Sequence, residues 1–443
     1  MSPNASMFQP GLPHRLWRLL PVAARRQALA RITALLAPRP ADPPPDPPLG
    51  GPQGVIIGGE LSCPSGIGEG ARLMIRAARA MGVPVWPLDI PSPTAWGRPA
   101  ATPEIFPPPH APLILHVNAP VLPLALLRLP RALTRDRRII ASWAWELPVV
   151  PPEWRAAAPL VHEIWVPSRF TAAAIEPLKP HRVHVVPPAL ALAPPQPSAL
   201  DRAAFGLPEQ AVIVLVSFNL ASSFARKNPL GAIAAFRQAF GDRDDRVLVL
   251  KICHADHAPA DFARIEQAAR APNIRVITGE MSGPDRHALT AAADIVLSLH
   301  RAEGFGLVPA EAMLLGKPVV ATGWSGNRDF MDAGNAALVG YRLIPAEDDR
   351  GVYRDALWAD PDIAEAASHL RRLADAPEER QRLGDRARAS VMMALNGEKL
   401  RVALRALGVH PGTPPVLPRL ASGVPGQTAP VGRDEVFATH DLV

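Results

Sequence analysis

The sequence predicts an α/β protein made of two consecutive domains, each with a parallel sheet covered by helices on both faces. Three observations lead to this prediction. The chain has 443 residues, more than the roughly 250 to 300 over which one hydrophobic core usually grows. Short apolar runs alternate with helix-like segments, which is typical of parallel sheets. This alternation occurs twice, on either side of a proline-punctuated stretch at residues 187–199.

The first series of elements follows a proline-rich stretch. An apolar run at 55–57 ends in glycines, and a helical pattern continues from about 71 to 81. We assign residues 1–52 to a basic N-terminal segment and proline-rich linker, and residues 53–195 to the first Rossmann-like domain. The remaining runs that predict strands of this domain are 83–88, 113–117, 138–142, 163–166 and 183–186.

The second series repeats the same pattern and extends over residues 196–395. From 363 to 407 the composition becomes helical and rich in Ala, Arg and Glu, and the tail at 411–443 is rich in Pro and Gly and predicted to be disordered. The apolar runs that predict strands of this second Rossmann-like domain are 211–217, 247–252, 274–277, 294–299 and 318–321.

Composition excludes several classes of protein. The formal charge of +6 suits phosphate-bearing partners, but it is spread too thinly to indicate a nucleic-acid-binding surface. Cys63 and Cys253 lie far apart without metal-ligand spacing, as is usual in a reduced cytoplasmic protein. We therefore expect neither a disulfide framework nor a metal site.

The N-terminus carries arginines among apolar residues, and no window of about 18 uninterrupted apolar residues exists anywhere in the chain. The sequence thus predicts no membrane span, and the N-terminus is too charged for a signal peptide. Two alternatives remain for this segment. It is either a basic amphipathic helix on an anionic membrane surface or a helix that packs against the domain.

The most informative stretch follows the predicted strand at 294–299. Glu303 and Glu311 enclose two glycines, Gly304 and Gly306, and a helix with a proline in its first turn begins there. Ligands bind at the carboxyl ends of parallel strands, and glycines let backbone N–H groups approach diphosphate oxygens. Carboxylates accept hydrogen bonds from vicinal hydroxyls. Alternatively, Glu311 merely favours a helix N-terminus and Glu303 is a solvated loop charge.

A basic pair stands after the predicted strand at 211–217. Arg226 and Lys227 lie just before a helix that begins near Pro229. Cations in that position can neutralise a diphosphate as it leaves a sugar. An ordinary basic helix entry is the alternative for an isolated pair of this kind.

A glycine-rich loop at 58–72 lies between the first predicted strand and helix. It has neither the Lys-Ser/Thr of a Walker loop nor a dinucleotide-binding fingerprint. Gly66 and Gly68 are its candidate ligand-binding residues, although such loops are often only tight turns.

These motifs resemble those of the retaining GT-B glycosyltransferases that carry a Glu-x7-Glu motif, the glycosyltransferase family 4-like or glycosyl transferases group 1 enzymes. The motif reads EGFGLVPAE here, and GKPVVAT at 316–322 also agrees with the family pattern. The resemblance implies a GT-B fold, in which the parallel sheets of two Rossmann-like domains face a central cleft. It also implies that residues 396–410 form a helix that crosses back onto the first domain.

The resemblance further implies roles for individual residues. Glu303, Arg226 and Lys227 would be catalytic, together with His116 near the transferred sugar, although a buried core histidine is a close alternative for His116. Glu146 would line the acceptor cleft, whereas packing between layers equally explains the tryptophans beside it. The residues expected to bind substrate, with Glu311 on the donor ribose, are Glu311, Gly304, Phe305, Gly306, Leu307, Gly66, Gly68 and Glu146.

The implied reaction is transfer of a hexose, with mannose as one possibility, from a nucleotide-diphosphate sugar to a saccharide or lipid-linked saccharide, with retention and without a metal ion or other cofactor. It would take place in the cytoplasm, with the N-terminal segment as a possible contact to the inner face of the membrane and no nucleic acid as partner. Two alternatives remain open: a GT-B nucleotide-sugar epimerase and a non-catalytic scaffold that binds sugar nucleotides.

Overall fold

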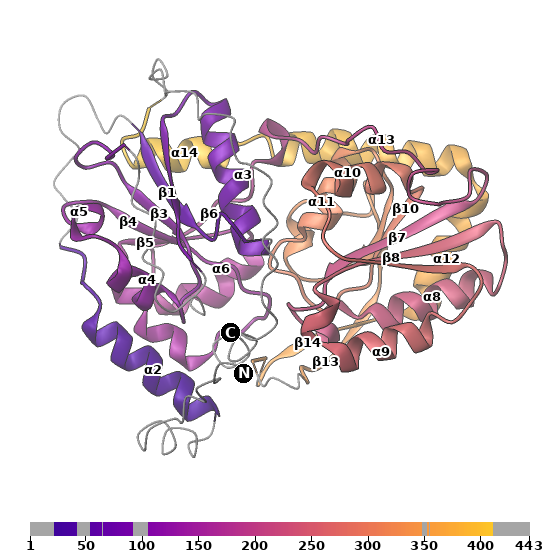
Figure 1. Cartoon of the computed structure of the whole chain (residues 1–443), viewed down its shortest axis with the longest axis horizontal. Helices are drawn as coiled ribbons and strands as arrows, with labels where there is room; N and C mark the ends of the chain where they lie inside the picture. The colour runs from indigo at the N-terminus through magenta and orange to yellow at the C-terminus, as the bar shows by residue number, and fades with distance from the viewer. Residues whose placement is uncertain are drawn as a thin grey trace, which may run out of the picture.

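Two α/β domains lie side by side in the computed structural model of the chain (Figure 1). The structure describes residues 22–41, 54–63, 65–91, 105–347, 352–353 and 355–410. Each domain is built on one six-stranded sheet, and every strand pair within these two sheets is parallel. The predicted fold class, two parallel-sheet α/β domains, is therefore confirmed.

The first sheet has the strand order β2-β1-β3-β4-β5-β6. Its central strands are mostly apolar and almost wholly buried, because helices cover both faces of a parallel sheet. The strands are β1 (Val55–Gly59), β2 (Val85–Asp89), β3 (Leu113–His116), β4 (Ile139–Ser142), β5 (Glu163–Val166) and β6 (Val183–Val185). The longer helices of this domain are α2 (Val22–Leu36), α3 (Gly66–Ala80), α4 (Leu122–Arg128) and α6 (Arg169–Ile175), and the short ones are α5 (Arg131–Thr134), η1 (Pro152–Ala156), η2 (Ala158–Leu160) and η3 (Glu176–Leu178).

The second sheet has the strand order β12-β11-β10-β7-β8-β9. Its strands are β7 (Val212–Asn219), β8 (Arg246–Cys253), β9 (Ile274–Thr278), β10 (Ile295–Ser298), β11 (Val319–Thr322) and β12 (Ala337–Val339). Its helices are α7 (Phe224–Lys227), α8 (Pro229–Phe240), α9 (Pro259–Ala268), α10 (Gly283–Ala292), α11 (Leu307–Leu314) and α12 (Ile363–Asp375), with short turns η5 (Ala255–His257) and η6 (Gly326–Asp329). A separate antiparallel hairpin, β13 (Tyr341–Pro345) and β14 (Leu357–Pro361), was not predicted.

The direction in which successive strands are added reverses once in each sheet. In the second sheet, this reversal fixes where the loops after β7 and β10 lie. In the first sheet β1 lies between β2 and β3, and in the second sheet β7 lies between β8 and β10. The loops that follow β7 and β10 leave neighbouring parallel strands at the same edge and in opposite directions. Such switch points form crevices in open α/β sheets.

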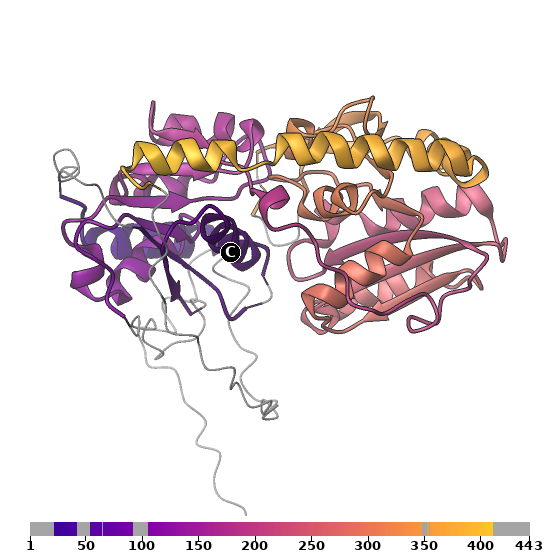
Figure 2. The same ribbon diagram turned by 90° about the horizontal axis from the view of Figure 1, so that it is seen from above.

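Two terminal helices connect the domains. Helices α13 (Pro377–Ala394) and α14 (Glu398–Ala406) lie end to end across both domains (Figure 2). In α14, Leu400 and Leu404 are buried in the cluster that contains Val55 and Ile57 of β1. The last described helix thus packs on the first domain although it follows the second in sequence.

The junction between α13 and α14 touches the segment that joins the two domains earlier in the chain, which contains the short turn η4 (Leu190–Leu192). The Ala191 N–H donates to the Leu395 carbonyl at 3.1 Å. Gly397 has a φ of +86°, and a Cβ at this position would lie 2.5 Å from Cδ1 of Leu192. Only glycine fits such a close approach in this backbone conformation.

Helix α2 packs on the first domain through small residues. Ala30, Ala34 and Ala37 are buried, whereas Ile32, Leu35 and Leu36 are 50%, 75% and 67% exposed. The N-terminal residues 1–21, the linker residues 42–53 and the proline- and glycine-rich tail lie outside the described residues. None of the helices in the described ranges is long and apolar enough to cross a membrane.

Candidate functional site

The basic pair sits on a one-turn helix whose ends are fixed by polar side chains. The Ser223 hydroxyl accepts a hydrogen bond from the Arg226 N–H and caps the start of α7. Asn228, in the left-handed region at φ +50°, ends this turn and caps α8. Its side-chain amide also donates to the Leu299 carbonyl at 3.0 Å. Asn228 therefore ties the loop after β7 to the end of β10.

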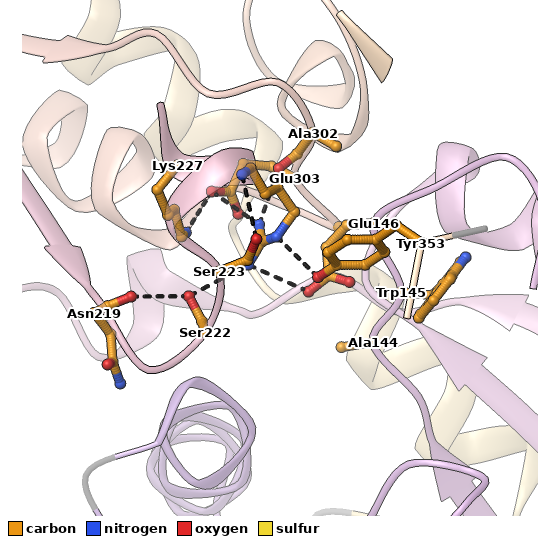
Figure 3. Close-up of polar contacts among 12 residues, drawn as sticks. Ala144, Trp145, Glu146, Asn219, Ser222, Ser223, Lys227, Ala302, Glu303 and Tyr353 are labelled. Carbon is orange, nitrogen blue, oxygen red and sulfur yellow. Dashed lines mark hydrogen bonds and ion pairs between the residues drawn. The ribbon is translucent and has the colours of Figure 1, made fainter. Parts of the chain in front are cut away.

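Glu303 lies in the loop after β10 and faces Lys227 (Figure 3). Its Oε1 is 2.5 Å from Nζ of Lys227 and 3.4 Å from Nη1 of Arg226. The loop that follows β11 holds this loop in place. The Glu303 N–H donates to the Ser325 hydroxyl, and the Glu303 carbonyl accepts from the Gly326 N–H, both at 2.8 Å. Residues 76 positions apart thus meet at the switch point of the second sheet.

Arg226 is 3% exposed, and its guanidinium is bound on every side. Nε donates to the Tyr353 hydroxyl at 3.1 Å, and Nη1 donates to the Ala302 carbonyl at 2.9 Å. Nη2 lies 3.6 Å from Oε1 of Glu146, which comes from the first domain. Arg226 therefore connects the two domains, and Figure 3 shows Glu146 and Tyr353 on the side away from Lys227.

The electrostatics of the site keep Glu303 ionised. Burial disfavours its charged form, but the charges of Lys227 and Arg226 outweigh that effect and lower its pKa to about 2. Burial, reinforced by the like charge of Arg226, lowers the pKa of Lys227, while Glu303 acts in the opposite direction. At neutral pH Glu303 can thus accept hydrogen bonds but cannot donate a proton.

The two glycines of the motif have different roles, and Gly304 lies where the domains meet. A Cβ on Gly304 would be 2.8 Å from the Trp145 carbonyl oxygen. The Gly304 carbonyl accepts from the Ser168 hydroxyl at 2.6 Å and from the Thr171 hydroxyl at 3.2 Å. Gly306 has a φ of +97° and precedes α11. Glycine is thus required here by close approach at one position and by backbone conformation at the other.

The start of α11 offers backbone donors to a ligand. The N–H groups of Gly304, Phe305 and Gly306 have no acceptor among the described residues. Phe305 itself is buried and packs on Phe330, with 4.9 Å between ring centroids. Leu307 is the first residue of the helix. The motif therefore combines an apolar anchor with free N–H groups, an arrangement suited to an anion.

Glu311 lies apart from the cluster of Glu303. It is on α11 and 8% exposed, and its Oε1 is 3.8 Å from Arg286 and 3.7 Å from His287, both on α10. No contact among the described residues joins Glu311 to Glu303. The two acids of the motif therefore have different partners within one loop-and-helix unit.

Of the predicted residues in the first domain, Glu146 reaches Arg226, whereas His116, Gly66 and Gly68 have no contact with the Glu303 cluster among the described residues. His116 ends β3 beside Gly59 of β1, and its Nε2 is 3.4 Å from Sδ of Met74. Burial lowers the pKa of His116 to about 4, so its imidazole is neutral at pH 7. Gly68 donates its N–H to the Ser65 hydroxyl, while the Cα of Gly66 borders open space.

Several residues of the site were not predicted from the sequence. Tyr353 lies between the hairpin strands β13 and β14 and packs on Trp145 with 5.6 Å between ring centroids. Ser168 and Thr171 reach Gly304 from across the domain boundary. No motif marks Tyr353, whereas the Ser168–Thr171 spacing is a recognisable helix cap at the start of α6.

Comparisons with known proteins agree with this architecture. The family model described as glycosyl transferases group 1 matches residues 218–358, which include the loops after both β7 and β10. No curated protein matches the chain in sequence.

Solved structures share the two-domain arrangement. A glycosyltransferase from Rickettsia africae has a TM-score of 0.57 at 12% identity and covers 80% of this chain and 98% of its own. HepE from Anabaena, solved with UDP and glucose, has a TM-score of 0.53 at 14% identity, covering 80% and 100%. A UDP-forming α,α-trehalose-phosphate synthase from Burkholderia xenovorans has a TM-score of 0.50 at 15% identity, covering 68% and 74%. Identities this low show a shared fold. Residues 218–358 therefore match the glycosyl transferases group 1 model, and the chain has the two-domain fold of these glycosyltransferase structures.

Proposed function

We propose that the chain is a retaining glycosyltransferase that moves a hexose from a nucleotide-diphosphate sugar to a saccharide or lipid-linked saccharide. The observation that carries this proposal is the cluster of Glu303, Lys227 and Arg226 at the switch point between β7 and β10. It joins a carboxylate that is ionised at neutral pH to two cations within the part of the chain that matches the family model.

Each residue of the proposed site has a role that suits its chemistry. Lys227 and the N–H groups at 304–306 would hold the diphosphate, where cationic and backbone donors suit phosphate oxygens. Glu303 would accept hydrogen bonds from hydroxyls of the transferred sugar, and Glu311 would do so from the donor ribose. His116 and the loop that contains Gly66 and Gly68 would face this donor from the first domain.

The proposed step exchanges one bond at the anomeric carbon. The bond from C1 to the diphosphate oxygen breaks, and the acceptor hydroxyl oxygen bonds to C1 on the same face. The acceptor's proton passes to the departing phosphate oxygen. Negative charge grows on the diphosphate in this step, and Lys227 and Arg226 would stabilise it in place of a metal ion.

Contacts between the domains support a site that excludes water. The hydroxyls of Ser168 and Thr171 bind the Gly304 carbonyl, and the Arg169 N–H donates to Asp329 Oδ2 at 2.8 Å. Closure around a bound donor would protect it from hydrolysis and strengthen local electrostatics.

The donor and acceptor define the first experiment. HepE was solved with UDP and glucose, so UDP-glucose stands beside GDP-mannose in a panel of labelled nucleotide sugars. The purified chain is incubated with each donor, with and without a membrane extract as source of acceptors. Label that moves to an acceptor with retained anomeric configuration supports the proposal. An isomerised free sugar indicates an epimerase, and tight donor binding without turnover indicates a scaffold.

Two substitutions test the site itself. We expect Glu311→Ala and Lys227→Ala each to lower transfer by orders of magnitude with the fold intact. Unchanged turnover in both variants would remove the site assignment.

The proposed location is the cytoplasm, with the N-terminal segment in contact with the inner face of the membrane. Exposed Ile32, Leu35 and Leu36 on α2 support this part of the proposal, because apolar side chains on a basic helix favour a membrane interface. Release of the chain from membranes by deleting residues 1–36 would support it. Equal membrane recovery of the full and shortened chains would contradict it.

A further inference from the structure

A pocket lies in the first domain, at the amino ends of strands β4, β5 and β6. It has a volume of about 230 Å³. Its lining residues are Pro40, Ala41, Arg138, Val161, His162, Lys179 and Arg182. Glu146 follows the carboxyl end of β4, whereas Arg138 precedes the start of that strand. The pocket and the contact of Glu146 with Arg226 therefore lie at opposite ends of this strand.

Strand register explains why basic residues gather in this pocket. Arg138, His162 and Arg182 stand one position before β4, β5 and β6, respectively. These three strands are neighbours and parallel, so their amino ends meet at one edge. Lys179 joins them from the turn after η3. The fold therefore builds a basic row from three separate loops.

Two of the basic residues that line the pocket have no acidic partner in the described part of the chain. Nζ of Lys179 donates to the Ala158 carbonyl at 3.1 Å, and no ion pair of the described residues includes Lys179 or Arg182. Arg138 pairs with Glu163 at 3.2 Å, but its Nε is buried and has no hydrogen-bond partner. A ligand that carries negative charge would pair with Lys179 and Arg182, which have no acidic partner of their own within the described ranges.

His162 lines the pocket, but both of its ring nitrogens already have backbone partners. Its Nδ1 accepts a hydrogen bond from the Ile139 N–H at 2.9 Å, which leaves the proton on Nε2. Nε2 lies 3.0 Å from the Ala41 carbonyl at the rim of the pocket. Burial and the like charge of Arg182 lower the pKa of Lys179, and a bound anion would oppose the effect of Arg182.

We propose that this pocket binds a phosphate group, either free or as the headgroup of an anionic lipid. Guanidinium and ammonium donors in a recess suit phosphate oxygens, and the volume is several times the roughly 30 Å³ of a water molecule. The site is independent of the proposed transfer reaction. Pro40 follows the exposed apolar end of α2 by four residues, which places a membrane-compatible surface beside the pocket.

The test compares the full chain with a variant that removes two charges, Lys179→Gln with Arg182→Gln. Arg237→Gln with Arg270→Gln is the charge-matched control, because both residues are exposed on the other domain. Inorganic phosphate and glycerol 1-phosphate are titrated by calorimetry at low salt. Vesicles of phosphatidylglycerol and of phosphatidylcholine are compared by co-sedimentation.

We expect the pocket variant, but not the control, to weaken phosphate binding by about tenfold or more, as loss of charge-assisted hydrogen bonds implies. If phosphatidylglycerol recovery falls as well, the source is a lipid headgroup, and if only the soluble titrations change, it is a free phosphate. A fall in vesicle recovery alone also supports the headgroup. Equal binding by the chain and the pocket variant in every titration, or equal losses in the control, would overturn the proposal. Circular dichroism checks that all variants fold.

Discussion

At the scale of single residues, Lys227 and Glu303 set the charge of the proposed donor site. Lys227 binds the carboxylate of Glu303 and remains partly accessible, whereas Arg226 is enclosed by Tyr353, Ala302 and Glu146. A diphosphate that enters the site therefore meets Lys227 more readily than Arg226. The greater accessibility of Lys227 determines the effect that we expect from its substitution.

Substituting Lys227→Ala should lower kcat of transfer by about a hundredfold to a thousandfold. A donor that stabilises developing negative charge contributes on this order to the transition state. Initial rates with saturating donor measure the effect. Lys399→Ala, on the exposed side of α14, is the matched control and should leave the rate unchanged. A Lys227→Ala enzyme that keeps full kcat would show that the leaving group is stabilised elsewhere.

The pKa of Glu303 predicts how stability depends on pH. Its folded-state pKa is about 2 and its ordinary value is 4.5, so the unfolded chain takes up this proton first as the pH falls. The stabilisation is complete above pH 4.5 and is lost as the pH falls towards 2. Glu303→Gln lacks this titration.

The free-energy difference between the chain and Glu303→Gln should therefore shrink by about 3 kcal/mol between about pH 6 and about pH 2. Denaturant unfolding of both proteins at a series of pH values measures it. A difference that stays constant over this range would argue against the ion pair with Lys227.

At the scale of elements, the loop after β10 joins the proposed donor site to the contact between the domains. Gly304 approaches Trp145 so closely that no side chain fits, and its carbonyl is bound by Ser168 and Thr171. A change at this one residue should therefore affect the contact between domains more than the fold of either domain.

Gly304→Ala should lower kcat/KM for the donor by at least about tenfold, because the added methyl group would keep the domains from meeting and misplace the reacting groups. The melting temperature should change little. Gly283→Ala serves as control, since a Cβ there meets nothing within 4 Å. Equal kinetic effects of the two substitutions would show that the contact at Gly304 is not needed for catalysis.

Elements that are marked by a local residue pattern could be predicted from the sequence. Buried parallel strands appear as apolar runs, so the strand that became β7 (Val212–Asn219) was predicted within two residues at its end. The meeting of Glu303 with Lys227 also follows from sequence, because both loops were expected at the carboxyl ends of parallel strands.

Other features depend on contacts that no local pattern contains. Strand β13 is short and solvent-exposed, so it lacks the apolar run of a buried strand. Tyr353 bonds to Arg226 across 127 positions, and Ser168 reaches Gly304 across 136. Glu311 carries the expected spacing, yet its contacts with Arg286 and His287 depend on how α10 packs on α11.

At the scale of the whole molecule, α14 is the part of the C-terminal region that stabilises the first domain. Leu400 and Leu404 are 1% and 2% exposed and lie in the same cluster as Ile57 and Trp165. Val402, on the same helix, is 56% exposed. The buried leucines and the exposed Val402 therefore provide a test of packing and its control on the same helix.

Leu400→Ala with Leu404→Ala should destabilise the first domain by about 4 kcal/mol or more, since each buried Leu→Ala change usually costs about 2 to 5 kcal/mol. Val402→Ala should have little effect on the free energy of unfolding. Denaturant unfolding, followed by the tryptophan fluorescence of the first domain, measures both. Similar midpoints for the two proteins would mean that α14 does not hold this domain.

The contact between Leu192 and Gly397 has a consequence for motion. The chain passes from one domain to the other at both places, and these two crossings touch each other. Two connections that meet at nearly one point act as a single hinge, about which one domain can swing with little change inside either sheet. The contacts across the domain boundary, such as those of Gly304 with Ser168 and Thr171, would then separate when the molecule opens to admit a substrate.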